Sequence, residues 1–318
     1  MEKVWNLKPQ GDSNEMKHLS AALNVNMVIA NLLVQRGIKT FSEAKHFFRP
    51  RLSDLHDPFL MKDMDKAVAR IEQAVDHQEK VLVYGDYDVD GTTSVAMIYL
   101  FLKDYIQDID YYIPDRYTEG YGISRQSIEY AARENFSLVI VLDCGIKAVE
   151  KVNLAKQHGL DFIICDHHNP GEIIPEAVAV LNPKRLECNY PYKELSGCGV
   201  GFKLLQAFTM KKKITQDKLF DLLDLVVVSI ASDIVPITGE NRVLAYYGLK
   251  KLNSNPGMGL QTIINYAGLN GEEITISDIV FKIGPRLNAS GRIEHGKKSV
   301  QILVSVDTVS SDALGEEI

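Results

Sequence analysis

The chain has 318 residues, a mass of 35.6 kDa and a formal net charge of −7. This length is enough for one large domain with a smaller one beside it. The negative charge argues against a dedicated nucleic-acid binder, and the lack of an apolar run of 18 residues or a signal peptide argues against a membrane or exported protein. The four cysteines form no Cys-x-x-Cys pair, which argues against zinc and indicates a reducing, cytoplasmic location.

The N-terminal part has the pattern of amphipathic helices. The segments "HLSAALNVNMVIANLLVQRG", "TFSEAKHFF" and "DMDKAVARIEQAV" fall within residues 18–77, and Thr40 is a suitable N-cap for the second of them. We therefore expect residues 1–76 to form a helical N-terminal region.

From Val81 the pattern changes to strands that alternate with helices. The short apolar runs "VLVYGD", "IDYYIP", "SLVIVLDCG" and "DFIICDH" are typical of buried strands, and "AVAVLN" is a further candidate. Between them lie the helical segments "TTSVAMIYLFLKD", "SRQSIEYAARE" and "KAVEKVNLAKQHG". This alternation predicts βαβ units, and hence an α/β fold with a mostly parallel sheet flanked by helices.

From Val200 onward the chain is mostly helical, as in "GFKLLQAFTMKKK", "QDKLFDLLDLVVVSIASD" and "NRVLAYYGLKKLN". The last stretch, "SSDALGEEI", has the pattern of a helix that stops without a cap. The sequence therefore predicts a helical C-terminal portion and indicates a fragment of a longer protein.

Acidic and imidazole side chains follow three of the predicted strands, in "GDYDVDG", "VLDCG" and "CDHHNP". The carboxyl ends of parallel strands meet at one edge of a sheet, so these side chains are expected to converge there. Negative charges so close to one another require a cation between them, and oxygen and imidazole ligands suit Mn²⁺ or Mg²⁺. More than four candidate ligands suggest two ions. The candidates are Asp86, Asp88, Asp90, Asp143, Asp166, His167 and His168.

Each of these motifs also has a simpler interpretation. "DYDVDG" opens like an EF-hand loop, but Met97 stands where a bidentate Glu is needed, and a strand precedes it. It could also be a solvated acidic turn. Asp143 could cap the next helix, and the two histidines could be a capping and a surface residue. Metal ligation is favoured because the three motifs occur together.

Two further motifs are weaker. "SGCGVG" (Ser196–Gly201) opens a helix and could hold a phosphate, but tight packing of that helix on the sheet explains the glycines equally well. "MKKK" (Met210–Lys213) is more typical of a solvated helix end than of a DNA contact.

The C-terminal half adds one acidic and one basic candidate. Asp233 ends the apolar helix "LLDLVVVSIA", and a charge at the end of a buried helix needs a partner such as a metal. "GPRLNASGRIEHGKK" reads as a basic loop that offers Arg286, Asn288, Arg292 and His295 among small residues. Small residues let backbone approach a ligand, and arginine suits a phosphate.

Taken together, "GDYDVDG", "VLDCG", "DHH", "ASD" and "GPRLNASGR", in this order and at these separations, resemble the DHH phosphoesterase family. The likeness runs from the region of Trp5 to about residue 305 and is strongest to the single-strand-specific exonucleases of the family. It implies a DHH catalytic domain over residues 77–305 and the start of a linker helix at 306–318. The DHHA1 and OB domains that normally follow would be missing.

The resemblance also implies roles for individual residues. Tyr84 stands where related pyrophosphatases carry a His, which counts against that activity. The implied metal ligands are Asp88, Asp90, Asp143, His167 and Asp233, with Asp86 as a further ligand or a close neighbour. The implied substrate-phosphate contacts are Arg286, Asn288, Arg292 and His168.

The implied function is hydrolysis of phosphodiester bonds in single-stranded DNA, 5′→3′, in repair and recombination in the bacterial cytoplasm. Two divalent ions, Mn²⁺ or Mg²⁺, would be the cofactors, and a single-strand-binding protein and a helicase would be partners. Tyr117 and Tyr121 could stack on bases, although packing of their loop is an equal alternative. A DHH phosphodiesterase for short oligonucleotides or cyclic dinucleotides, and a scaffold that has lost its metals, remain alternative hypotheses.

Overall fold

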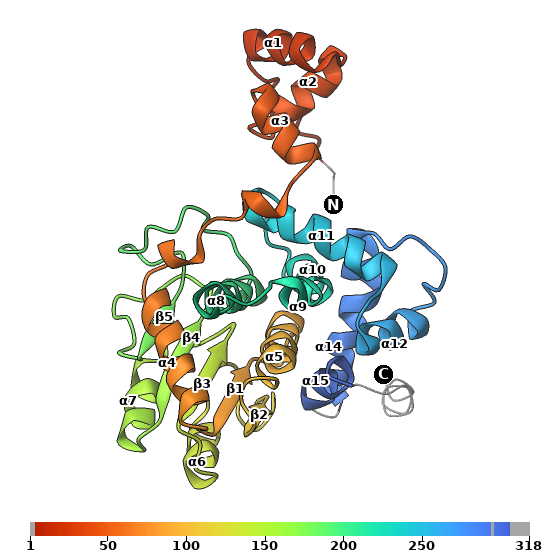
Figure 1. The fold of residues 1–318 in the computed structure, drawn as a ribbon. Coiled ribbons are helices and arrows are strands. Elements are labelled where there is room, and N and C mark those ends of the chain that lie inside the picture. Colours follow the sequence, from red (N-terminus) through yellow and green to blue (C-terminus); the bar gives the residue numbers. More distant parts are fainter. Residues whose placement is uncertain (1–3, 294–295, 306–318) are drawn as a thin grey trace. The chain divides into compact units, whose positions relative to one another are not determined.

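The computed structural model describes residues 4–293 and 296–305 (Figure 1). The chain divides into two compact units, Met1–Leu55 and His56–Ile318, which we describe separately. The predicted boundary at residue 76 stays a prediction. The predicted start of a linker helix at 306–318 lies outside the described residues.

The first unit is helical. Its elements are α1 (Ser13–Leu23), α2 (Met27–Val34), α3 (Phe41–Phe48) and the 3₁₀ turn η1 (Leu52–Asp54). The predicted N-cap Thr40 is confirmed: it forms a capping box with Glu43, in which each side chain binds the backbone N–H of the other end. The small core of this unit consists of Met16, Leu19, Ala30, Leu33, Val34, Ile38 and Ala44.

The second unit is built on a five-stranded parallel sheet, so the predicted α/β fold is confirmed. The strands are β1 (Val81–Gly85), β2 (Ile109–Tyr112), β3 (Leu138–Leu142), β4 (Asp161–Cys165) and β5 (Ala179–Leu181), in the spatial order β2-β1-β3-β4-β5. β1, β3, β4 and β5 are almost wholly buried, as their continuous apolar runs require.

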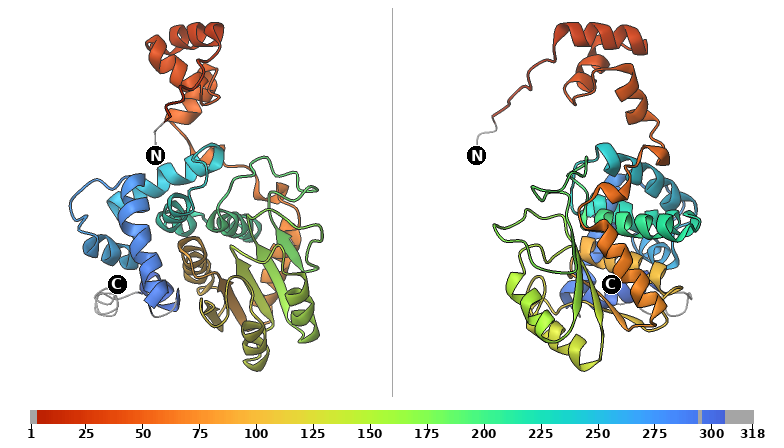
Figure 2. Two further views of the ribbon diagram at one scale, coloured as in Figure 1. Left: turned by 180° about the vertical axis from the view of Figure 1, so that it is seen from behind. Right: turned by 60° about the vertical axis from the view of Figure 1, so that its left-hand side comes forward.

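Helices cover both faces of the sheet (Figure 2). On one face lie α6 (Arg125–Arg133) and α7 (Val149–Gln157), whose Ile128, Ala131, Val152 and Ala155 pack on the core side of the strands. On the other face lie α4 (Met64–Asp76), α5 (Val89–Leu102) and α8 (Gly197–Lys212). The short 3₁₀ turn η2 (Pro58–Leu60) precedes α4.

The remaining helices follow α8 in sequence. They are α9 (Asp217–Phe220), α10 (Leu223–Ser232), α11 (Gly239–Ser254), α12 (Met258–Tyr266), α13 (Ile276–Asp278), the π-helical turn η3 (Ile279–Ile283), α14 (Gly284–Ile293) and α15 (Gly296–Leu303). α10 packs against α5, α8 and α11, and its residues 223–231 are buried. Within the described part of the chain, no helix has the length and apolar character that a membrane crossing needs.

The prediction of a loop at "GPRLNASGR" is wrong, because this segment forms α14. Leu287, which is 1% exposed, anchors the helix in the core. The helix begins close to the end of α10, since a Cβ on Gly284 would lie 2.7 Å from Ser232 Oγ. The small residues therefore serve helix packing as well as any approach of a ligand.

Candidate metal centre

The strand order reverses between β1 and β3. The chain leaves β1 for β2 on one side of it and then returns to form β3 on the other side. In open parallel sheets such a reversal leaves a crevice at the carboxyl ends of the two strands, which is where ligands bind. Asp86 follows β1 and Asp143 follows β3, so both carboxylates lie at this position.

The turn after β1 depends on a close approach between α5 and the strand. Asp88 is the N-cap of α5, and its side chain accepts a hydrogen bond of 2.9 Å from Gly91 N. A Cβ on Gly91 would lie 2.3 Å from the Asp86 carbonyl oxygen, so glycine is required here. Asp86 Oδ1 accepts from Gly122 N at 3.2 Å, while its buried Oδ2 has no partner among the described residues.

Asp90, in the first turn of α5, is held by the N-terminus of α8. Its carboxylate accepts hydrogen bonds from Gly197 N (2.6 Å) and Cys198 N (2.8 Å), and from Ser229 Oγ of α10 (2.7 Å). Free N–H groups at a helix start favour an anion. At the start of α8, in "SGCGVG", the anion that accepts these hydrogen bonds is the Asp90 carboxylate and not a phosphate. The structure therefore supports the interpretation that the glycines allow close packing of this helix.

Asp143 and His167 form the centre of the cluster. Asp143 is 1% exposed and adopts a left-handed backbone with φ 59°. Its Oδ1 lies 3.1 Å from His167 Nε2, and the same nitrogen lies 3.7 Å from both Asp90 Oδ2 and Asp233 Oδ2. Neither ring nitrogen of His167 has a hydrogen-bond partner in the described part of the chain, and neither has Asp143 Oδ1.

Asp233 reaches the cluster from the end of α10, as predicted from the apolar helix before it. It is the C-cap residue, and its side chain is 30% exposed, so the cluster is open to solvent on this side. Asp90, His167 and Asp233 together offer three ligand atoms within 4.8 Å of one another. Asp143, His167 and His168 offer a second such group.

Asp166 organises the turn that carries the histidines. It accepts hydrogen bonds from Ile146 N (2.8 Å), His167 N (2.7 Å) and His168 N (3.0 Å), and its Oδ1 lies 2.8 Å from His168 Nδ1. Burial alone would raise the pKa of Asp166, but these hydrogen bonds, led by the one from His168, lower it. Asp166 is therefore an orienting residue, and it leaves the Nε2 side of the His168 ring to face the cluster, where the Tyr121 hydroxyl lies 3.4 Å away.

The carboxylates of the cluster repel one another. Burial, and then the charge of Asp88, raises the pKa of Asp86 to about 7. Burial, and then the charges of Asp90 and Asp88, raises the pKa of Asp233 to about 7. The pKa values of Asp88 and Asp143 are also raised, first by burial and then by Asp90.

The residues present fit divalent metal ions. Buried carboxylate oxygens and imidazole nitrogens without partners are the donors that Mn²⁺ and Mg²⁺ take, and a cation among them would restore full ionisation of the carboxylates. Two overlapping donor groups that share His167 give room for more than one ion.

The structure describes only part of the residues that were predicted to contact the substrate phosphate. Arg286 is half-buried on α14, and its Nη1 donates to the Lys282 carbonyl at 2.9 Å. Asn288 is half-buried further along the same helix. The backbone of Arg292 belongs to α14, and its side chain lies outside the described part. These three roles stay predictions.

Tyr121 lies at the edge of the cluster. Its hydroxyl is 3.3 Å from the Asp143 carbonyl and 3.4 Å from His168 Nε2. Its ring meets Tyr87 edge-on at 6.2 Å, and the Arg116 guanidinium lies 5.1 Å from the Tyr87 ring centre. Tyr117 is 77% exposed.

Sequence reasoning missed several of these contacts. Arg116 and Tyr87 were not identified, and neither were Ser229 and Gly197 as partners of Asp90. The residues that Asp90 binds are 107 to 139 positions away in the sequence, so no local pattern could reveal them.

The chain is similar to known proteins over almost its whole length. Residues 80–230 match the model of the DHH family, N-terminal domain. The chain is 40% identical over 314 residues to the single-stranded-DNA-specific exonuclease RecJ of Bacillus subtilis (strain 168). That match covers 99% of this chain and 39% of the Bacillus protein.

Two solved structures have the same fold. One is an exonuclease RecJ bound to manganese, which is 29% identical with a TM-score of 0.75 over 84% of this chain and 66% of that one. The other is RecJ from Thermus thermophilus in complex with Mn²⁺, which is 26% identical with a TM-score of 0.81 over 96% of this chain and 43% of that one. This chain thus spans only part of the length of each relative.

Proposed function

We propose, on the premise that this chain belongs to the DHH family, that it forms the catalytic core of a metal-dependent 5′→3′ exonuclease acting on single-stranded DNA. The observation that carries the proposal is the convergence of three carboxylates and His167 on one strand-order reversal, in a chain 40% identical to a RecJ exonuclease. The resemblance that the sequence motifs indicated is confirmed.

We assign the metal ligands as predicted: Asp88, Asp90, Asp143, His167 and Asp233, with Asp86 beside them. Bound Mn²⁺ or Mg²⁺ would supply Lewis acidity and lower the pKa of a bound water. The protein holds the ligands rigidly. Asp90 is fixed by three hydrogen bonds, and Asp143 by its left-handed backbone and by the bond from its N–H to the Cys165 carbonyl.

His168 is a candidate hydrogen-bond donor to a phosphoryl oxygen. Its hydrogen bond with Asp166 raises its pKa and fixes the ring, which leaves Nε2–H directed to the solvent side of the cluster. Arg286, Asn288 and Arg292 of α14 are proposed to bind neighbouring phosphates, since guanidinium groups bind phosphate oxygens in pairs.

The same premise extends the proposal to DNA repair and recombination in the bacterial cytoplasm. Single-stranded DNA is the proposed substrate, and a single-strand-binding protein and a helicase are the proposed partners.

The test is a degradation assay with purified chain and Mn²⁺. The substrates are a 5′-phosphorylated single-stranded oligonucleotide labelled at its 5′ or its 3′ end, its duplex form and a dinucleotide. We expect mononucleotides from the 5′-labelled single strand at the earliest times, and little product from the duplex. Release that begins at the 3′ end, or cleavage of the dinucleotide alone, would contradict the proposal.

A further inference from the structure

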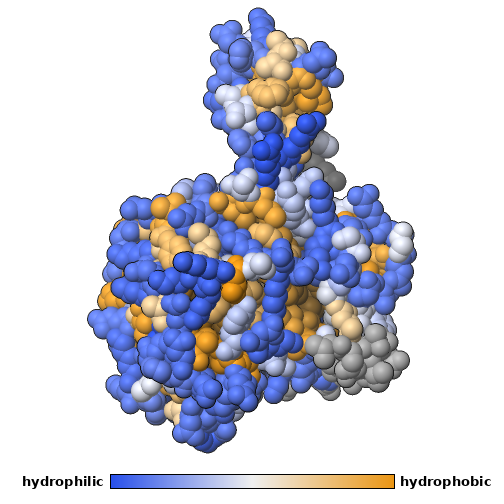
Figure 3. Space-filling model, viewed as in Figure 1, coloured by the Kyte–Doolittle hydropathy of each residue, from blue (hydrophilic) through white to orange (hydrophobic). Residues whose placement is uncertain are grey.

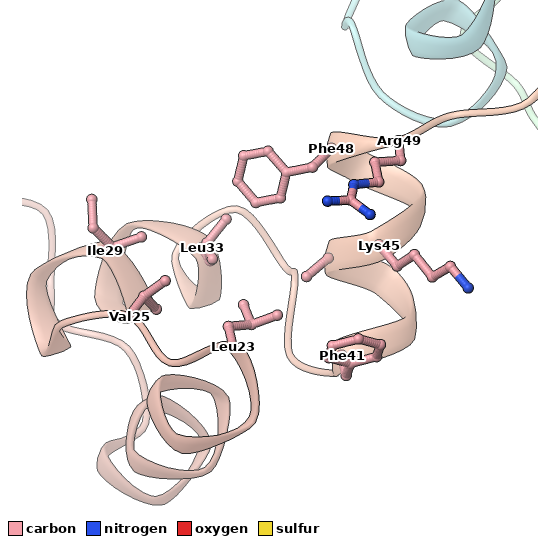
Figure 4. Close-up of a pocket in the computed structure, with 9 residues that line it drawn as sticks. Leu23, Val25, Ile29, Leu33, Phe41, Lys45, Phe48 and Arg49 are labelled. Carbon is pink, nitrogen blue, oxygen red and sulfur yellow. The ribbon is translucent and has the colours of Figure 1, made fainter.

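The first unit carries an apolar pocket that the catalytic chemistry does not use. The cavity has a volume of about 500 Å³ and lies between α1, α2 and α3 (Figure 4). This volume is within the range of pockets that hold ligands. Its lining comes entirely from residues 23–49 and comprises Leu23, Val25, Ile29, Leu33, Phe41, Ala44, Lys45, Phe48 and Arg49.

The apolar side chains around this pocket are unusually exposed. Ile29, Phe41 and Phe48 are 40%, 56% and 54% exposed, and Val28 and Leu32 of α2 extend the apolar surface beyond the pocket. Apolar colour gathers on the same unit in Figure 3. α2, "MVIANLLV", is apolar on nearly every side, so only part of it can face the small core of this unit. Patches of this kind mark interaction surfaces.

Two cations contribute to the lining of the pocket, Lys45 of α3 and the C-cap residue Arg49. In Figure 4 the ring of Phe48 and the guanidinium of Arg49 project from the end of α3 towards the α2 side, whereas Lys45 extends from the outer side of the helix. Among the described residues of the first unit, ion pairs join Lys39 to Glu15 and His46 to Asp54, and neither Lys45 nor Arg49 takes part in one. The nearest carboxylate on α3 is Glu43, which is occupied by its hydrogen bonds to Lys39 N and Thr40 N.

We propose that this pocket docks an amphipathic segment of a partner protein, with bulky apolar side chains inserted between α2 and α3 and acidic side chains facing Arg49. Peptides commonly bind in this way, with the apolar face of a helix laid into a groove. Residues 1–55 hold eight Lys and Arg against five Asp and Glu, although the whole chain has a net charge of −7. The positive first unit therefore suits an acidic partner.

Other occupants fit less well. In a symmetric contact between two copies of the chain, the same patch would face itself, and its lining offers no carboxylate that could pair with Lys45 or Arg49. The phosphates of a nucleic acid could pair with the two cations. However, protein surfaces that bind nucleic acid are polar, and most of the side chains that line this pocket are apolar.

The test uses peptide selection on the full-length chain in EDTA, so that it does not depend on nuclease activity. A phage library of random peptides of roughly 12 residues is selected on the immobilised chain, and the enriched sequence is synthesised with a fluorescent label. We expect it to combine bulky apolar with acidic residues. Arg49→Glu and Phe48→Ser should each weaken binding by about tenfold or more.

Matched controls are Lys17→Glu, another exposed cation of the first unit, and Phe281→Ser, another exposed phenylalanine that is 76% exposed. Both should leave binding unchanged. Arg49→Glu alters only an exposed side chain, so it remains informative if Phe48→Ser lowers the melting temperature.

Three results would overturn the proposal. One is the absence of enriched peptides, or enriched peptides that bind Arg49→Glu and Phe48→Ser as well as the parent. Another is oligo(dT) binding that Arg49→Glu removes, which would assign the surface to nucleic acid. The third is a concentration-dependent dimer in sedimentation that Phe48→Ser removes, which would assign it to a second copy.

Discussion

The central residues of the site are held in an arrangement that is unfavourable without a cation. His167 Nε2 is surrounded by Asp143, Asp90 and Asp233 at 3.1 to 3.7 Å, yet it makes no hydrogen bond among the described residues. Burial lowers the pKa of His167, so this ring is not readily protonated to neutralise the carboxylates. Such a cluster destabilises the metal-free fold and gives metal binding its driving force.

Replacing Asp143 with Asn tests this balance. The substitution keeps the shape of the side chain but removes one buried negative charge. Because the remaining carboxylates then repel less, the melting temperature in EDTA should rise. Activity in Mn²⁺ should fall by at least about 100-fold, the upper end of the cost of losing a residue that supports a metal ligand. Asp65→Asn, at an exposed position of α4, should change neither value. An Asp143→Asn variant with near-full activity would remove Asp143 from the ligand set.

The pH dependence of stability follows from Asp86 and Asp233. Their pKa values are about 7 in the folded chain, against about 4 in an unfolded one. The folded state thus binds more protons, and this contribution to stability is complete below about pH 4 and is lost as the pH rises through 7. The melting temperature in EDTA should therefore be lower at pH 8 than at pH 5.5.

Mn²⁺ should reverse that trend, since it binds the ionised carboxylates. The melting temperature should rise on adding Mn²⁺ at pH 8 and change little at pH 5.5. A metal-free protein whose melting temperature increases from pH 5.5 to pH 8 would show that these carboxylates are not crowded as described.

The site depends on how closely the helices α8 and α5 approach the strand ends. A Cβ on Gly197 would lie 2.6 Å from Asp143 Cβ and 2.9 Å from its Cα, and Gly197 N also donates to Asp90. One glycine therefore fixes the spacing between a helix start and two proposed ligands.

The substitution Gly197→Ala should displace α8 from Asp143. We expect a loss of about 1–3 kcal/mol in the free energy of unfolding, typical of overpacking. Activity should fall further than this loss explains, because the Asp90 and Asp143 carboxylates shift relative to each other. Gly171→Ala is the matched control, since its Cβ would meet no atom closer than 3.7 Å. Equal behaviour of the two variants would refute the role of Gly197.

A buried ion pair joins α8 to α11. Lys203 Nζ lies 3.0 Å from Glu240 Oε1 and donates to the His56 carbonyl at 2.6 Å, while Glu240 also accepts from His56 N and Tyr190 OH. Both charged side chains are at most 1% exposed. The pair therefore anchors His56, the first residue of the second unit, to the helices α8 and α11.

Lys203→Met should destabilise the chain by about 3–5 kcal/mol, because Glu240 would remain buried without its cation. The double variant Lys203→Met/Glu240→Gln should recover part of this loss. Denaturant unfolding of the two variants and the parent measures both values. A single-variant loss below about 1 kcal/mol would mean that Glu240 finds water or protonates without cost.

The elements could be predicted to different degrees. The strands and the ends that carry Asp86, Asp143 and His167 follow from short apolar runs, which local sequence records. α14 was missed because its small residues lack a strong helical pattern, and it is held by contacts such as Gly284 with Ser232, far away in the sequence. The anchoring of Asp90 by Ser229 was missed for the same reason.

Charge is distributed unevenly along the chain. Residues 1–55 are net positive, whereas the second unit carries the acidic cluster and the chain as a whole has a net charge of −7. Because the charge that a partner meets is local, the overall net charge does not argue against the proposed binding of single-stranded DNA.

The chain spans 39% of the length of its Bacillus subtilis relative, and the substrate contacts proposed for it lie close to the cluster. We therefore expect it to cleave short oligonucleotides and to bind long DNA weakly. With a short oligonucleotide and Mn²⁺, turnover should be readily measured, while KM for long single strands should be high. Steady-state kinetics with oligonucleotides of increasing length measures this. A KM that falls steeply with length would show that this part of the protein binds long DNA by itself.

Anomalous diffraction at the manganese edge, from crystals grown with Mn²⁺, would show directly whether the cluster binds metal ions. We predict two peaks at the carboxyl ends of β1 and β3, each within coordination distance of carboxylates from the set Asp86, Asp88, Asp90, Asp143 and Asp233, with His167 bound to one of them. Asp143→Asn crystals should lose at least one peak. Peaks elsewhere, or none at this edge of the sheet, would contradict the assignment of the cluster as a metal centre.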